Sequence, residues 1–174
     1  SLQMGWSESP AFFCSATETA RDVASARCSL PPGAVAPHPL APLTIDPTRL
    51  IQARTHLPGP PNTDLAHDSF IHLLEVYIDD FCALAQTTDE TQLRHLSSAI
   101  LTSIHEVFPP PKHTGQNAAD DPISLKKLQQ GDGVWDTRKE ILGWVFDGIS
   151  HCLELPPDRA DKLCSELHRM GRRT

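Results

Sequence analysis

The spacing of apolar residues predicts three helices. Over residues 87–108 apolar side chains recur every three or four positions, the period of a helix with one buried face, and Thr87 and Glu90 are spaced as a capping box. Residues 9–26 open with serine and proline, a favoured helix start, and continue with helix-forming residues. A short third helix is expected over 156–170, with three apolar residues on one face: Leu163, Leu167 and Met170.

Two other stretches have the composition of β-hairpins. Residues 70–84 carry β-branched and aromatic residues on both sides of Asp79-Asp80, where the chain is expected to bend. Residues 139–155 are expected to form a second hairpin that turns at Asp147-Gly148. Nine prolines interrupt the pattern over 28–66 and predict a loop-like or disordered insert. Helices and hairpins in this order predict an α+β fold with an antiparallel sheet.

Composition narrows the class of protein. A chain of 174 residues with 39% hydrophobic and 21% charged residues can form one domain with a core. Its net charge of −7 argues against a free-standing nucleic-acid binder that depends on a basic surface. Neither a membrane span nor a signal peptide is visible, so no membrane partner is expected. Five cysteines without a CxxC pair fit a reducing compartment, which predicts an intracellular protein, cytoplasmic or nuclear.

The adjacent carboxylates Asp79 and Asp80 stand out because charge in an apolar hairpin needs compensation. They could form a solvated turn, pair with basic residues, or bind a divalent metal ion. Residue chemistry alone favours the solvated turn, since aspartate is common in turns. The apolar residues on both sides of the pair suggest instead a bend packed inside a larger body, where hard cations bind carboxylate oxygens.

Three ordered segments, and a short fourth one, resemble reverse transcriptases. Tyr77-Ile78-Asp79-Asp80 matches the family's YxDD signature in a strand–turn–strand context. Residues 2–13, LQMGWSESPAFF, resemble the segment LPQGxxxSPxxF, and residues 139–163 resemble the primer-grip hairpin and the helix that follows it. The sequence LKK at 125–127 is similar to the lysine-bearing segment before that hairpin. The resemblance is to the palm of a retrotransposon enzyme, of an LTR (gypsy-like) or a tyrosine-recombinase (DIRS-like) element.

The resemblance implies an incomplete polymerase palm, an antiparallel sheet with packed helices and a Pro-rich insert. It departs from the family pattern at Gln3 and Met4, where many members carry proline and glutamine. The family's first catalytic aspartate precedes the Gly5-Trp6 segment, so we expect an N-terminally truncated fragment. The implied parts are 1–27, the palm segment and helix after that strand; 28–66, the insert; 67–155, the palm with the YIDD hairpin, amphipathic helix and primer-grip-like hairpin; and 156–174, the start of a thumb-like helix and tail.

By resemblance, Asp79 would be the principal and Asp80 the secondary ligand of two Mg²⁺ ions, with Mn²⁺ as an alternative, and both would be catalytic. Residues implied to contact nucleotide or primer are Tyr77, Met4, Gly5, Gly143, Trp144 and Lys127. From its place two residues before Asp79 on a strand, Tyr77 is expected to share a face with it. Trp144 is equally well explained as a core aromatic, and a solvated lysine pair is the favoured explanation of Lys127 and its neighbour.

The implied function is template-directed DNA synthesis by the full-length enzyme, with an RNA or DNA template-primer, dNTPs and the missing polyprotein segments as partners. Two Mg²⁺ ions carry four positive charges and the aspartate pair two negative ones, so we expect the isolated chain to bind metal weakly and to be inactive. The alternatives are a non-catalytic remnant or domesticated interaction module, and a small Mg²⁺- or Ca²⁺-binding module unrelated to polymerases.

Overall fold

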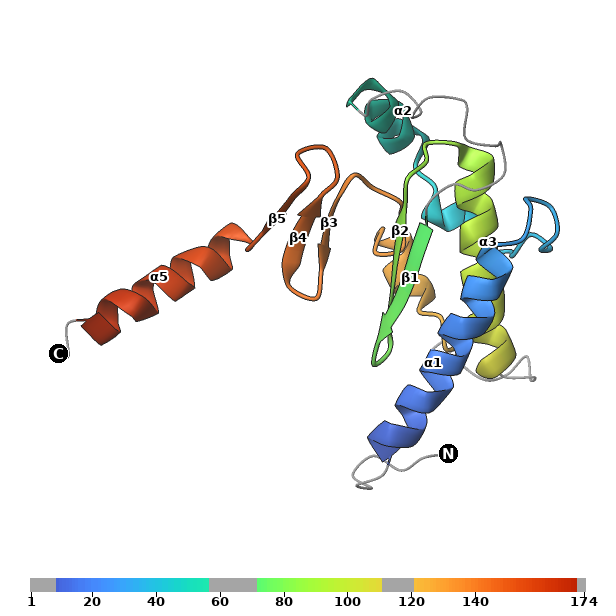
Figure 1. The fold of residues 1–174 in the computed structure, drawn as a ribbon, viewed down its shortest axis with the longest axis horizontal. Helices are drawn as coiled ribbons and strands as arrows, with labels where there is room; N and C mark the ends of the chain where they lie inside the picture. Colours follow the sequence, from blue (N-terminus) through green and yellow to red (C-terminus); the bar gives the residue numbers. More distant parts are fainter. Residues whose placement is uncertain (1–8, 57–71, 111–120, 172–174) are drawn as a thin grey trace.

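The computed structural model describes residues 9–56, 72–110 and 121–171. These ranges form helices and two small antiparallel sheets, which confirms the predicted α+β class (Figure 1). The elements in chain order are α1 (Ser9–Cys28), the 3₁₀-helix η1 (Ala41–Thr44), α2 (Pro47–His56), β1 (His72–Tyr77), β2 (Asp80–Ala85), α3 (Glu90–Val107), α4 (Leu125–Gln129), β3 (Arg138–Ile141), β4 (Trp144–Asp147), β5 (Cys152–Glu154) and α5 (Pro157–Gly171).

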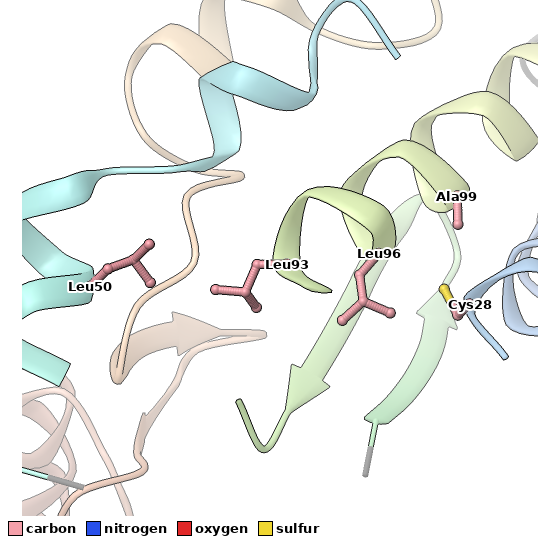
Figure 2. Close-up of a cluster of buried hydrophobic side chains, with 5 residues drawn as sticks. All are labelled: Cys28, Leu50, Leu93, Leu96 and Ala99. Carbon is pink, nitrogen blue, oxygen red and sulfur yellow. The ribbon is translucent and has the colours of Figure 1, made fainter. Parts of the chain in front are cut away.

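The main body is a pair of helices, α1 and α3, that lie side by side with the β1–β2 hairpin against them (Figure 1). The core between the elements contains five buried side chains, shown in Figure 2: Cys28, Leu50, Leu93, Leu96 and Ala99. Ala85 at the end of β2 packs against the same cluster. Burial of these side chains therefore also fixes where the hairpin lies.

Polar contacts reinforce the packing of α1 against α3. Arg27, in the last turn of α1, donates to Ser103 Oγ at 2.9 Å and forms an ion pair with Glu106. Helix α3 begins one residue after Asp89, whose Oδ1 accepts the Thr91 N–H at 2.8 Å. The cap is thus Asp89, two residues beyond the Thr87 that the sequence pattern predicts.

The Pro-rich insert contains regular structure that the sequence analysis did not predict. Pro47 occupies the first position of α2, and Asp46 Oδ1 accepts the Thr48 N–H at 2.8 Å. Proline at this position lacks only an N–H that would have had no helical partner, and the carboxylate caps the helix. The expectation of a loop or disorder is therefore wrong for residues 41–56, while residues 57–66 lie outside the described ranges.

The strands form two separate sheets, β1–β2 and β3–β4–β5, where a single palm-like sheet was expected. β3 and β4 are joined by Leu142 and Gly143, whose φ values of 51° and 82° are both positive, as a two-residue type I′ turn requires. The predicted turn at Asp147-Gly148 opens a longer loop to a third strand, β5. The carboxylate of Asp147 accepts the N–H groups of Ser150 and Ile149 there.

Helix α5 follows β5 and extends away from the α1–α3 body (Figure 1). Its predicted apolar face is present on the helix and exposed, as are all its residues from Asp161 to Gly171. No helix in the described part of the chain is long and apolar enough to cross a membrane.

Candidate metal-binding turn

The candidate site is the tip of the β1–β2 hairpin. Tyr77 ends β1, Asp80 begins β2, and these two residues are direct cross-strand partners. The bend therefore falls on Ile78 and Asp79, one residue earlier than the sequence predicts. Because Asp79 lies in the turn, the expectation that Tyr77 shares a strand face with it is wrong. The side chain paired with Tyr77 is that of Asp80.

The two faces of the hairpin have different environments. Leu74 is buried, and the strand period places Val76 and its partner Phe81 on the same face. The opposite face carries Glu75, Tyr77 and Asp80. Glu75 accepts a hydrogen bond from Arg21 Nη1 of α1 at 2.9 Å, which ties the middle of the hairpin to the helix. The buried face and the Arg21–Glu75 ion pair on the opposite face therefore both anchor the hairpin, and Asp80 lies on the face of Glu75.

The tip itself projects into solvent. Tyr77 is 59% and Ile78 50% exposed, and both aspartates are exposed as well. Among the described residues neither Asp79 nor Asp80 has an ion-pair partner. Within the described chain the pair therefore forms a solvated turn, and the body expected to enclose it is not among these residues.

The backbone of the turn is strained. Ile78 has φ +59°, in the left-handed region where a β-branched side chain crowds the backbone. A hairpin turn of this length usually has glycine or asparagine at such a position. Strained residues of this kind concentrate at ligand-binding and catalytic sites. Sequence reasoning missed this feature, because isoleucine gives no signal of a left-handed conformation.

The oxygen donors at the tip suit Mg²⁺ or Mn²⁺, which prefer carboxylate ligands. Asp79 and Asp80 are adjacent and exposed, so a hydrated ion can reach both. They amount to a partial ligand set, because no group of three or more His, Cys, Asp or Glu residues in the described ranges could hold a metal ion.

The other predicted residues are not brought to this tip. Gly143 and Trp144 belong to the second sheet, and Lys127 lies on α4 with its side chain exposed. Met4 and Gly5 lie outside the described residues. The structure thus does not assemble a nucleotide-binding surface around the aspartates from this set.

Gly143 has an evident structural role. A Cβ atom there would lie 1.6 Å from Arg159 Nη1, and the same guanidinium donates to the Gly143 carbonyl at 3.1 Å. Arg159 also lies 3.4 Å from Glu140, so it fastens the start of α5 to the β3–β4 hairpin. Sequence reasoning missed Arg159. Trp144 is 44% exposed, so within the described chain it is not a buried core aromatic.

Comparisons with known proteins found no relative: no family model, no curated protein and no solved structure matches the chain.

Proposed function

We propose that this chain is part of the palm of a retrotransposon reverse transcriptase, of the LTR (gypsy-like) or DIRS-like kind, in which Asp79 and Asp80 bind the catalytic metal ions. The observation that carries the proposal is the two-residue turn of the YIDD motif. It exposes two carboxylates on a backbone held at an unusual φ. A site that must aim its carboxylates can retain such strain, although a bulky residue at positive φ also occurs at Leu142 in the β3–β4 turn.

Asp79 and Asp80 would hold Mg²⁺ or Mn²⁺, which when bound supplies charge neutralisation at the transferred phosphoryl group. Tyr77 extends from the same tip, opposite Asp80, and would pack against the primer end or the incoming nucleotide. The buried face of the hairpin and the Arg21–Glu75 ion pair hold this tip in place. The chain's role is therefore to position carboxylates and primer.

The described part of the chain supplies only two carboxylates at this tip, too few to balance two divalent ions. We therefore expect activity to need a further aspartate from the longer polypeptide, together with a template-primer and dNTPs. An intracellular location, cytoplasmic or nuclear, accords with this chemistry.

Metal binding at the tip is tested by adding Mn²⁺ to the ¹⁵N-labelled chain and following paramagnetic broadening of its amide signals. The expected result is broadening that begins at residues 77–80 and disappears in the Asp79→Asn/Asp80→Asn variant. Asp132→Asn, which removes an exposed carboxylate elsewhere, serves as the matched control and should leave the broadening unchanged. Broadening that is not centred on the tip, or that persists without both aspartates, would contradict the proposal and favour a non-catalytic remnant.

A second test separates the polymerase from an unrelated metal-binding module. The coding sequence upstream of the codon for Ser1 should continue in frame and encode a strand that carries an aspartate. A stop codon or frameshift there would favour a remnant, and an open frame without such a strand would favour a module of another family.

A further inference from the structure

Two histidines and an aspartate form a continuous chain of hydrogen bonds between separate parts of the fold. His38, in the segment between α1 and η1, has its Nε2 3.1 Å from Nδ1 of His105, near the end of α3. Nε2 of His105 is 3.0 Å from Oδ1 of Asp121, which precedes α4. At the other end, the Leu40 N–H donates to Nδ1 of His38 at 3.2 Å.

The two ends of this chain fix the position of every proton within it. The Leu40 amide can only donate, so Nδ1 of His38 must accept and carries no proton. Neutral His38 therefore has its proton on Nε2 and donates it to Nδ1 of His105. His105 in turn has its proton on Nε2 and donates it to the Asp121 carboxylate, which can only accept. All three hydrogen bonds are thus satisfied when both imidazoles are in the Nε2–H form.

No second arrangement satisfies all three hydrogen bonds. A proton added to His38 points Nδ1–H at the Leu40 N–H. A proton added to His105 points Nδ1–H at the Nε2–H of His38. If His38 then changed tautomer, its Nδ1–H would again face Leu40. Protonation of either imidazole thus places two donors against each other and breaks one link.

Among the described residues, the charged groups around these hydrogen bonds do not remove the conflict. Asp121 attracts a proton to the pair, but its Oδ1 also accepts the Ile123 N–H at 2.8 Å. Glu106, the next residue of α3, is already paired with Arg27. Burial and the neighbouring His105 lower the pKa of His38, while Asp121 raises it. The two lowering influences outweigh the third, so the net shift of the His38 pKa is downward, which favours neutral His38 near pH 7.

We propose that the hydrogen-bonded chain from Leu40 through His38 and His105 to Asp121 is a pH-sensitive fastening: protonation of His38 releases the Leu40 N–H from Nδ1, and protonation of His105 releases His38 from α3. Loss of these hydrogen bonds would affect the neighbouring contacts between the insert and α3. The His38 N–H also donates to Ser98 Oγ of α3, and η1 follows directly with buried Ala41 and Thr44. Opening at His38 therefore loosens the first half of the Pro-rich insert. This inference does not depend on the proposed polymerase function.

The tautomers can be read in the unaltered protein. Long-range ¹H–¹⁵N correlation spectra of the imidazole rings at pH 7.5 should show His38 and His105 both in the Nε2–H form. Hydrogen exchange of the Leu40 amide gives the second measurement. Its protection factor, corrected for intrinsic exchange, should fall by about tenfold or more between pH 7.5 and 5.5. The Ile123 amide, which donates to Asp121 Oδ1 and to neither imidazole, should keep its protection over this range.

Two variants separate titration from packing. His38→Asn offers Oδ1 as an acceptor for the Leu40 N–H without a group that titrates, so protection of that amide should become independent of pH. His56→Asn, at the exposed end of α2, is the matched control and should keep the wild-type response.

Three results would overturn the inference: an Nδ1–H tautomer at either ring, equal protection of the Leu40 amide at pH 7.5 and 5.5, or an unchanged pH response in His38→Asn. The first two come from the wild-type protein, so they decide the matter even if a variant fails to fold.

Discussion

Replacement of Ile78 tests the strain in the candidate metal-binding turn. At φ +59° the Cβ atom of any L-residue crowds its own backbone, and only glycine avoids this. The variants Ile78→Gly and Ile78→Ala both lose the half-exposed side chain beyond Cβ, so the comparison between them isolates the backbone contribution. Val76, on β1 with a negative φ, is the matched control position.

The magnitude follows from two opposing terms. A left-handed conformation costs an L-residue about 1–2 kcal/mol, which the alanine variant keeps and the glycine variant loses. Glycine loses more conformational freedom on folding, which disfavours it by about 0.5–1 kcal/mol relative to alanine. At Ile78 the glycine variant should therefore be the more stable by about 0.5–1 kcal/mol. At Val76 only the second term acts, so the alanine variant should be the more stable.

Urea unfolding followed by far-ultraviolet circular dichroism measures these differences. With a slope of about 1–3 kcal/mol per molar urea, the transition midpoints of each pair should differ by about 0.2–1 M. The diagnostic result is the reversal of order between the two positions. An Ile78→Ala variant at least as stable as Ile78→Gly would show that the turn is not strained.

Three further predictions concern the core of the α1–α3 body and the second sheet. Leu96 is only 2% exposed, so Leu96→Ala should lower the free energy of unfolding by about 2–5 kcal/mol in the same urea experiment. Ile51 is 62% exposed and serves as the control, so Ile51→Ala should lower it by less than about 0.5 kcal/mol. Burial raises the pKa of the Cys28 thiol to about 11. Iodoacetamide at pH 8 should therefore label the exposed Cys152 and leave Cys28 unmodified until the protein unfolds. Equal labelling of the two cysteines in the folded protein would contradict this prediction. Hydrogen bonds from the β4–β5 loop, that of the Ser150 backbone N–H first, lower the pKa of the Asp147 carboxyl to about 2. The stability that this carboxylate contributes is therefore present above pH 4 and is lost as the pH falls toward 2. A midpoint near pH 4 in a ¹³C titration of the Asp147 carboxyl would disprove this prediction.

The long helices could be predicted because their sequence signals and their tertiary surroundings agree. Residues 87–108 have a helical period of apolar residues, and this face packs into the core at Leu93 and Leu96. The first helix extends to Cys28, two residues past the predicted end, because the Cys28 side chain is buried in the same core. Local propensity and burial point the same way in both helices.

Other elements could not be predicted, for physical reasons specific to each. The prolines of the insert obscured the helix start at Asp46-Pro47, although an acidic cap followed by proline is a recognised start signal. The Asp147-Gly148 pair has the composition of a tight turn, but the Asp147 carboxylate instead closes a longer loop. At Ile78 the observed conformation opposes residue preference, so no propensity rule finds it. Such disagreements are expected at strained or functional positions.

Primer extension tests the proposed function most directly. A further catalytic aspartate is expected outside these 174 residues, so the polypeptide to be assayed is one that includes such a strand together with this chain. We expect template-dependent incorporation of dNTPs with Mg²⁺, lowered by about 10²–10³-fold or more in Asp79→Asn and unchanged in Asp132→Asn. Extension that survives Asp79→Asn, or equal activity of the isolated 174-residue chain, would contradict it.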